Sequence, residues 1–318
     1  MQTLYLDENQ QCIDVIAKRI SVKSMLTNTV LLTVPACELS EIIAFGDVAL
    51  STKTLRSLGK YGISLVCLNR TDRQAKMLCH NIEHGQINRR LQQYALMHDR
   101  AKCHYLAQRL VSKKTQGHIN VLLQNGQTNA YQQAILETAI SALHALKRQF
   151  MQADSSATLL GLEGTAARIY FTALGKIIEP HWHFNGRQKR PNRDPINALL
   201  SLTYSLVHWE IVRQCYGKGL DPYLGFFHKP LNGRESLACD GIELLRPTID
   251  AWVIRLLEEQ HLSVSDFKHD HGAIVLCTSA RAIYFKHYSA QSLLWRKNVR
   301  RYVDWFCKLI DQPQQSTP

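Results

Sequence analysis

A change in hydrophobic pattern divides this chain of 318 residues into a short first part and a long second part. The first part carries short apolar runs at 30–35, 41–45 and 63–68, which are rich in branched residues and bounded by Gly, Pro, Asn or Asp. Such runs are typical of strands. A short helix capped by Ser51 or Thr52 is expected between the second and third runs. The first part is therefore predicted to form a small sheet domain.

The second part has apolar residues at helical spacing. Long segments of this kind occupy 87–110, 131–151 and 197–213. Near the C-terminus, 272–277 and 282–285 interrupt the pattern with two short apolar runs that can form a hairpin. The second part is therefore predicted to be mostly helical.

Together the two patterns predict the α+β class, with a small N-terminal β-rich domain followed by a larger, mostly α-helical domain. A chain of this length is expected to hold roughly two domains. We place the β-rich domain at 1–75, a hinge at 76–86 and the helical domain at 87–318.

The charge balance is compatible with a nucleic-acid partner without identifying one. Lys and Arg number 38 against 26 Asp and Glu, a formal net charge of +12. Such a charge favours a polyanion and makes binding salt-dependent. A basic protein with no such partner would have the same balance, so the argument needs specific residues.

The cysteines and the apolar runs indicate a reduced, cytoplasmic protein. The nine cysteines form no Cys-x-x-Cys unit, and no apolar run approaches the ~18 residues of a membrane span. The first ten residues lack the pattern of a signal peptide. Histidines at 181–183 and 269–271 have no cysteine partners at zinc-finger spacing, so we expect solvated surface histidines there.

Four acidic or imidazole residues in glycine-containing motifs suggest a phosphoryl-transfer site. They are Glu163, His228, Asp240 and Glu243. Asp240 and Glu243 are three residues apart, which places both on one helix face, where they can offer two oxygens to one ion. Carboxylates suit Mg²⁺, and an imidazole also admits Mn²⁺. Taken singly, each has an ordinary alternative: a surface carboxylate, a packed histidine, or a solvated helix face with Glu243 paired to Arg246.

The motifs that carry these residues resemble those of the CRISPR-associated spacer-acquisition integrases, the larger of the two universal CRISPR adaptation proteins. The family pattern is a glycine-flanked Glu before Ala-Ala-x-x-Tyr-Phe, then Gly-Leu-Asp-Pro-x-x-Gly-Phe-x-His, then Gly-Arg-x-Ser-Leu-Ala-x-Asp-x-x-Glu-x-x-Arg-Pro. This chain has all three in order, at 159–171, 219–228 and 233–247. A further family block lies at 184–200, and 45–52 resembles the family's N-terminal β domain.

The resemblance implies a metal-dependent DNA integrase or endonuclease. Its substrates would be the 3′-hydroxyl ends of a spacer precursor and the CRISPR repeat, joined by transesterification. Glu163, His228 and Glu243 would bind Mg²⁺ or Mn²⁺. Asp240 would be the fourth catalytic residue. It would either bind the ion or hydrogen-bond to the residues that bind it. Many members carry a second acid where this chain has Leu244, which leaves the relative roles of Asp240 and Glu243 open.

The resemblance also implies partners. Family members form homodimers, and a small ferredoxin-like adaptation subunit bridges two dimers. The β-rich domain would make the dimer and partner contacts. The DNA partners would be the spacer precursor and the CRISPR repeat with its leader.

Cationic and aromatic side chains near the motifs are candidates for DNA contact, because flexible cations reach phosphates without reading sequence. They are Tyr170, Arg187, Lys189, Arg190, Arg193, Lys229, Arg296 and Arg300. The cations can equally be solvated surface charges, and Tyr170 can be a core residue. Asn197 is expected to secure the 184–200 loop rather than perform chemistry.

Two other functions use the same residues. A structure-specific DNA endonuclease would replace the 3′-hydroxyl by water, and a non-catalytic DNA-binding scaffold would have lost the ion. The chain has no phosphate-binding Gly-x-x-x-x-Gly-Lys loop and no dinucleotide-binding glycine fingerprint, so ATP use is not indicated.

Overall fold

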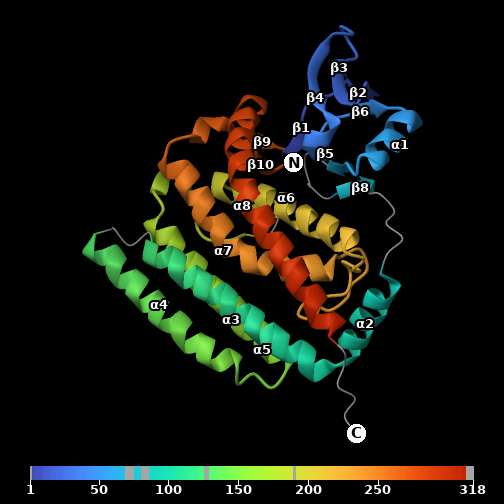
Figure 1. Ribbon diagram of the computed structural model, residues 1–318. Helices are drawn as coiled ribbons and strands as arrows, with labels where there is room; N and C mark the ends of the chain where they lie inside the picture. Colours follow the sequence, from blue (N-terminus) through green and yellow to red (C-terminus); the bar gives the residue numbers. More distant parts are fainter. Residues whose placement is uncertain (1, 69–74, 80–85, 125–128, 189–190, 313–318) are drawn as a thin grey trace. The chain divides into compact units, whose positions relative to one another are not determined.

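The computed structural model describes residues 2–68, 75–79, 86–124, 129–188 and 191–312 (Figure 1). It divides into two compact units. The first comprises Met1–His84 with Arg281–Gln291, and the second comprises Gly85–Ala280 with Ser292–Pro318. In the described part of the chain, no helix combines the length and hydropathy that a membrane span requires.

Among the described residues, the N-terminal part of the first unit contains two four-stranded sheets and the α-helix α1 (Thr52–Lys60). Its strands are β1 Gln2–Leu6, β2 Gln11–Ile16, β3 Arg19–Ser24, β4 Val30–Pro35, β5 Leu39–Ala44, β6 Val48–Leu50, β7 Ser64–Leu68 and β8 Ala75–Cys79. One sheet has the order β1-β5-β7-β8 and the other β4-β3-β2-β6. Buried aliphatic residues from both sheets, including Ile13, Ile20 and Ile42, share one core with Leu58 of α1.

The strands predicted at 30–35, 41–45 and 63–68 are confirmed as β4, β5 and β7, and the predicted helix is α1. Ser51 is its N-cap, because the Ser51 side chain accepts a hydrogen bond from the Thr54 backbone N–H. The hinge placed at 76–86 starts differently from the prediction, since 76–79 belong to β8, while 80–85 lie outside the described residues. The α+β class itself is confirmed.

A segment of the last helix belongs to the first unit, although the sequence pattern assigned it to the helical domain. In this segment Arg281 pairs with Asp7 at 2.7 Å, and Phe285 stacks on Tyr5 with ring centroids 4.4 Å apart. The sequence boundary at residue 87 placed all later residues in the helical domain, because the local pattern does not report which core a segment joins.

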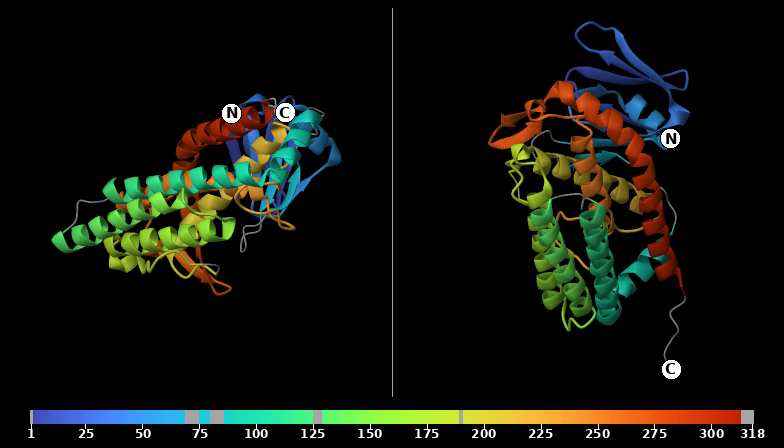
Figure 2. Two further views of the ribbon diagram at one scale, coloured as in Figure 1. Left: turned by 90° about the horizontal axis from the view of Figure 1, so that it is seen from below. Right: turned by 90° about the vertical axis from the view of Figure 1, so that its left-hand side faces the viewer.

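The second unit is mostly helical. Its elements are α2 Ile87–His98, α3 Arg100–Gln124, α4 Ala130–Phe150, α5 Ser156–Ile177, α6 Pro195–Gly217, α7 Ser236–Glu258, β9 Phe267–Asp270, β10 Ala273–Leu276 and most of α8 Thr278–Asp311. Helices α3, α4 and α5 lie side by side, and α7 packs against both α3 and α6 (Figures 1 and 2).

Two of the predicted elements need correction. The helix expected over 87–110 is interrupted at Asp99, which ends α2 and whose side chain accepts a hydrogen bond from the Lys102 backbone N–H at the start of α3. The hairpin expected from 272–277 with 282–285 instead pairs β10 with β9, which precedes it. Residues 282–285 lie within α8 (Thr278–Asp311) and are helical.

Helices α3 and α7 approach closely because α3 has a glycine at the contact. A Cβ atom added at Gly117 would lie 2.6 Å from Pro247 Cγ and 2.8 Å from Pro247 Cβ. Such distances exclude even an alanine unless the helices separate. The same contact brings the turn of α3 that carries Lys114 against the turn of α7 that carries Glu243.

Candidate active site

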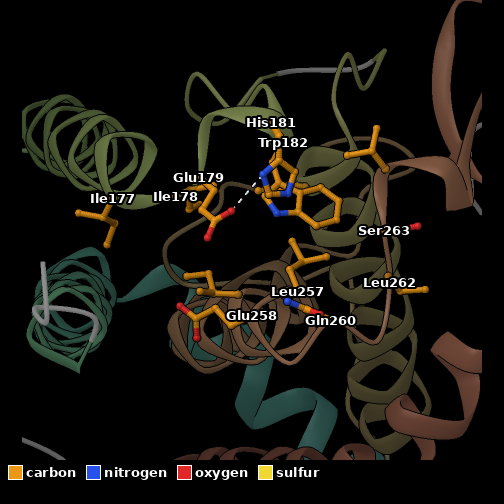
Figure 3. Close-up of a pocket in the computed structure, with 13 residues that line it drawn as sticks. Ile177, Ile178, Glu179, His181, Trp182, Leu257, Glu258, Gln260, Leu262 and Ser263 are labelled. Carbon is orange, nitrogen blue, oxygen red and sulfur yellow. Dashed lines mark ion pairs between the residues drawn. The ribbon is translucent and has the colours of Figure 1, made fainter.

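The predicted site residues lie away from the apolar pocket at the end of α5. That pocket has a volume of about 560 Å³ and is lined mainly by apolar side chains such as Ile177, Trp182 and Leu257 (Figure 3). At its rim, the exposed His181 pairs with Glu179 at 3.1 Å, as suits a surface histidine. None of the four candidate catalytic residues is among the described residues that line it.

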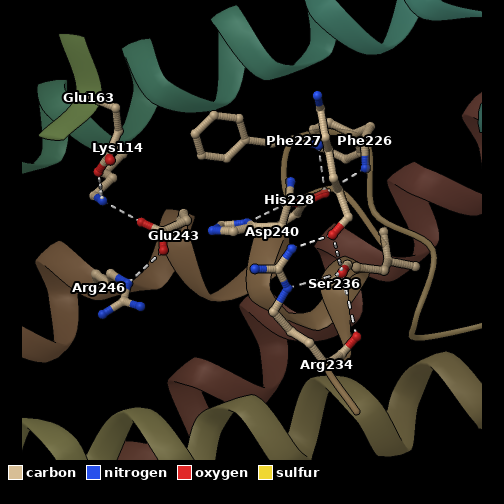
Figure 4. A network of polar contacts seen from close by, with 12 residues as sticks. Lys114, Glu163, Phe226, Phe227, His228, Arg234, Ser236, Asp240, Glu243 and Arg246 are labelled. Atoms are coloured by element: carbon tan, nitrogen blue, oxygen red, sulfur yellow. Dashed lines mark hydrogen bonds and ion pairs between the residues drawn. The ribbon is translucent and has the colours of Figure 1, made fainter. Parts of the chain in front are cut away.

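Glu163 and Glu243 meet across a lysine. Glu163 lies on α5 and Glu243 on α7, and the Lys114 ammonium on α3 pairs with Glu163 Oε1 and with Glu243 Oε2 (Figure 4). Lys114 and Glu243 are buried, and 16% of the Glu163 side chain is exposed. Three helices therefore converge on one cation shared by two carboxylates.

Glu243 also has a second cationic partner. Its Oε1 atom accepts a hydrogen bond from Arg246 Nε at 2.8 Å, so the pair expected from their spacing is present in addition to the lysine contact. Burial alone would raise the pKa of Glu243, but Arg246 and Lys114 outweigh burial and hold this pKa well below its usual range. His228 adds a smaller effect of the same sign. Glu243 is therefore an ionised carboxylate in a buried position.

Asp240 organises the loop that carries His228. Its carboxylate accepts hydrogen bonds from the backbone N–H groups of Phe226 at 2.7 Å, Phe227 at 3.0 Å and His228 at 2.9 Å. The same carboxylate accepts a bond from His228 Nδ1 at 2.7 Å (Figure 4). Because both Asp240 oxygens face the loop, the geometry favours a positioning role for Asp240 over metal ligation.

The loop can reach Asp240 only because residue 225 is glycine. A Cβ atom at Gly225 would lie 2.6 Å from Asp240 Oδ2 and 2.7 Å from the carbonyl oxygen of Ser236. Beyond the histidine, the Lys229 carbonyl accepts hydrogen bonds from Ser236 Oγ and from Arg234 Nη2, which closes the loop onto the start of α7. The His228 side chain stays 23% exposed at the surface of this assembly.

The donor set suits a hard divalent cation. Two carboxylate oxygens, Glu163 Oε1 and Glu243 Oε2, already pair with one cation, the Lys114 ammonium. Carboxylates with an imidazole are ligands that Mg²⁺ or Mn²⁺ accepts. In the described part of the chain, three or more His, Cys, Asp or Glu side chains do not gather as a ready-made ion cage. The ammonium of Lys114 lies between the two carboxylates instead.

Behind this centre, a buried carboxylate joins two tyrosines. Asp250 Oδ2 accepts a hydrogen bond from the Tyr170 hydroxyl at 3.1 Å, and Asp250 Oδ1 accepts one from the Tyr204 hydroxyl. The Tyr204 ring lies under the guanidinium groups of Arg246, at 4.5 Å, and Arg187, at 5.5 Å. Because Arg246 also pairs with Glu243, this network supports the back of the site.

Tyr170 is a core residue, so the prediction that it contacts DNA is wrong. It is fully buried, and its ring stacks on His118 with centroids 3.8 Å apart. Burial and the cation of Lys114 lower the pKa of His118 well below its usual value, which leaves the imidazole neutral. An aromatic ring held in this way offers no face to a base.

Asp250 should make stability depend on pH. Burial raises its pKa from 3.8 to about 6, against the opposing effect of the tyrosine hydrogen bonds. The folded protein therefore keeps a proton that the unfolded chain loses, and Asp250 makes folding less favourable as pH rises from 4 to 6. Asp250→Asn, which cannot ionise, should gain about 3 kcal/mol in free energy of unfolding relative to the parent between pH 4 and pH 7. Urea unfolding across that range measures the difference.

The surface variant Asp304→Asn serves as the control for loss of a carboxylate, since Asp304 lies in an exposed pair with Lys218. If the free energies of unfolding of Asp250→Asn and the parent differed by the same amount at all pH values, the raised pKa of Asp250 would be contradicted.

An open groove of about 870 Å³ runs along α5, α6 and the loop between them, and reaches the site at Arg246. Arg168 and Arg187 also line it. Arg187 donates hydrogen bonds to Asn197 at 2.6 Å and to Ser201 at 3.0 Å, and these bonds fix its guanidinium at the groove wall.

The other predicted DNA contacts differ in outcome. Arg193, Lys229 and Arg300 are exposed, while Lys189 and Arg190 lie outside the described residues. The prediction for Arg296 is wrong, because this side chain is buried and pairs with Glu210 at 3.7 Å.

Asn197, in the first turn of α6, secures the chain just before this helix, in line with the role expected for it. Its side chain accepts hydrogen bonds from Arg187 and from the Gln188 backbone N–H, and donates to the Gly186 carbonyl at 2.9 Å and to Asp194 at 2.7 Å. Asp194 in turn is the N-cap of α6, and Pro195 follows it at the first helical position.

Sequence reasoning missed Lys114 and the Asp250 network. The signal for Lys114 was its place on a buried helix face, between Val111 and His118, where a lysine needs a carboxylate partner. Asp250 offered a similar signal, because it lies one and three residues from the apolar Ile249 and Val253 in the same helix.

Comparison with known proteins places this geometry in a family. A family model described as CRISPR associated protein Cas1 matches residues 4–290. The protein named CRISPR-associated endonuclease Cas1 1 from Thermodesulfovibrio yellowstonii is 31% identical over 284 residues, which cover 85% of this chain and 86% of that protein.

Two solved structures have a similar fold. A CAS1 protein from Thermotoga maritima aligns over 100% of this chain and 99% of its own, with a TM-score of 0.84 and 21% identity. A casposase bound to integration product aligns over 98% of this chain and 94% of its own, with a TM-score of 0.81 and 19% identity. Since the family model spans most of the sequence, the chain belongs to the family of CRISPR-associated Cas1 proteins.

Proposed function

We propose that this chain is a metal-dependent DNA integrase of CRISPR adaptation, which joins the 3′-hydroxyl ends of a spacer precursor to the CRISPR repeat by transesterification. The observation that carries the proposal is the convergence of Glu163 and Glu243 on one cation, beside a histidine held by Asp240. Relatives named as endonucleases and a neighbour titled as a casposase with its integration product support the same class of chemistry.

Glu163, Glu243 and His228 would hold Mg²⁺ or Mn²⁺. The bound ion would supply neutralisation of the charge that develops at the reacting phosphate. Asp240 accepts the His228 Nδ1 hydrogen bond, which leaves Nε2 as the nitrogen available to a ligand. Arg246 keeps Glu243 ionised and fixes its Oε1 atom, so that Oε2 faces Glu163 through Lys114.

The groove beside the site supports a DNA substrate. Arg168, Arg187 and Arg246 line it, and guanidinium groups bind phosphates in a bidentate manner. Exposed Arg193, Lys229 and Arg300 would add contacts with the backbone. The net charge of +12 would draw the polyanion in and make its binding weaken with salt.

The proposed assembly is a homodimer, two of which are bridged by a small ferredoxin-like adaptation subunit. In the first unit, β4 is an edge strand of its sheet, and Val30, Leu31 and Leu32 on it are exposed. An edge strand with apolar side chains in solvent is typical of a contact surface. This surface supports the proposed role of the β-rich domain in subunit contacts.

Strand joining tests the function directly. A labelled 3′-hydroxyl duplex is incubated with repeat-containing plasmid, Mg²⁺ or Mn²⁺ and the small adaptation subunit. The intact protein should give joined product, and Glu163→Ala and His228→Ala should lower the yield at least about 100-fold, because each removes a group from the reacting centre. Omitting the metal should have the same effect.

The outcome also separates the alternatives. Cleavage without joining by the intact protein would favour an endonuclease in which water replaces the 3′-hydroxyl. DNA binding with neither reaction would favour a scaffold and overturn the proposed chemistry.

A further inference from the structure

We propose that Lys114 is a resident cation, which holds the position of the divalent metal in the metal-free protein and must be displaced when the metal binds. The inference rests on the proposed function, because it assumes that Glu163 and Glu243 bind the ion. It assigns a role to a residue outside the sequence motifs described above, on a helix that carries none of them.

The contacts of Lys114 carry the argument. Its ammonium pairs with one oxygen from each of the two carboxylates, Glu163 Oε1 and Glu243 Oε2, and 8% of its side chain is exposed. The remaining Glu243 oxygen already pairs with Arg246. On Glu243, the oxygen that remains for a bridging metal is therefore the one that Lys114 occupies.

A protonated lysine and a divalent ion compete for these oxygens. The ammonium has no lone pair to give to a metal, and at contact distance it repels the ion. Without any cation, the two carboxylates would face each other in a poorly solvated position, which is unfavourable. Lys114 therefore keeps the site assembled before the ion arrives, and binding becomes an exchange of one cation for another.

The helix contact described above makes this position stable. Gly117 lies one turn from Lys114, and its lack of a side chain lets α3 approach Pro247 on α7. Lys114 therefore lies on a helix that is packed against α7, and not on a loop. Glu163 is the more exposed of the two carboxylates, so the ion can enter from its side.

The test compares Mn²⁺ binding to the purified full chain without DNA, by titration calorimetry. Lys114→Met should bind Mn²⁺ at least about tenfold more tightly than the parent, because no cation must be displaced. Lys113→Met is the matched control: it makes the same charge change at the neighbouring, exposed position and should leave the affinity within about twofold. Glu163→Gln should weaken binding in either background.

Thermal unfolding supplies a second readout. Without metal, Lys114→Met should unfold at a lower temperature than the parent, and saturating Mn²⁺ should raise its midpoint by more than it raises the parent's. If the methionine variant does not fold without metal, Lys114→Gln, a neutral residue that still donates hydrogen bonds, takes its place in the same measurements.

The outcomes distinguish this inference from the proposed function. If the parent binds Mn²⁺ and the neutral Lys114 variants bind it equally or more weakly, the resident-cation role is wrong and the metal site stands. If neither the parent nor these variants bind Mn²⁺, the metal site is wrong and the inference falls with it.

Discussion

Glu243→Ala should abolish strand joining and lower the free energy of unfolding by about 3–5 kcal/mol. The carboxylate is buried and pairs with Lys114 and Arg246 through different oxygens. Its removal leaves both cations without their shared partner and takes one of the proposed ligands from the ion. Urea unfolding and the strand-joining assay on the same preparation measure the two effects.

Two further variants separate the structural effect from the chemical one. Glu243→Gln keeps the shape of the side chain and one acceptor oxygen, so it should lose joining completely but less stability. Glu258→Gln, at an exposed carboxylate near the end of the same helix, should change both quantities little. Joining by Glu243→Gln at the parental rate would rule Glu243 out as a ligand.

Asp240→Asn should lower joining at least about 1,000-fold, although Asp240 itself is not placed on the ion. Both carboxylate oxygens accept bonds from the loop, from three backbone N–H groups and the His228 ring. An amide has one acceptor oxygen, and its NH₂ group would face donors. We expect the loop to shift, the His228 ring to lose its orientation, and the free energy of unfolding to fall by about 2–4 kcal/mol.

His228→Ala is the informative comparison for this prediction. It removes the ring but keeps the three backbone hydrogen bonds to Asp240, so it should lose joining with a much smaller loss of stability. Equal losses of stability in the two variants would mean that the backbone bonds contribute little. If Asp240→Asn joined strands at the rate of the parent, the conformation of the 226–228 loop would not depend on the carboxylate.

The relative roles of Asp240 and Glu243 show where sequence patterns stop being informative. Their spacing correctly places both on one helix, α7. Three residues on a helix leave about 60° between side-chain directions, which is enough for Asp240 to face the 226–228 loop while Glu243 faces α3. Only the positions of the loop and of α3 decide this, and both depend on contacts between segments distant in the sequence.

Long-range packing also explains the two wrong DNA contacts. Tyr170 lies seven residues after Glu163 and Arg296 lies in a basic segment, and these positions made both candidates for DNA contact. The structure buries Tyr170 against His118 and pairs Arg296 with Glu210, partners that come from other helices. A helical period identifies the faces of a helix, but the partner of each face depends on the tertiary arrangement.

Local signals were sufficient where the local sequence decides the structure. The branched apolar runs became β4, β5 and β7, and the Ser51 cap started α1. The C-terminal hairpin was misplaced because the partner strand, β9, is short and polar, with the sequence Phe-Lys-His-Asp, and carries little strand signal. Its pairing with β10 depends on the turn between them, where His271 and Gly272 both have positive φ.

The contact between Gly117 and Pro247 makes substitutions at these two distant positions depend on each other. Pro247 has no N–H to donate to the carbonyl of Glu243, four residues earlier, so α7 lacks one helical hydrogen bond at the turn that carries this carboxylate. A methyl group at residue 117 would meet the proline ring and not the backbone of α7. The effect of a substitution at either position therefore depends on the residue at the other, and the two should vary together among sequences that keep this helix spacing.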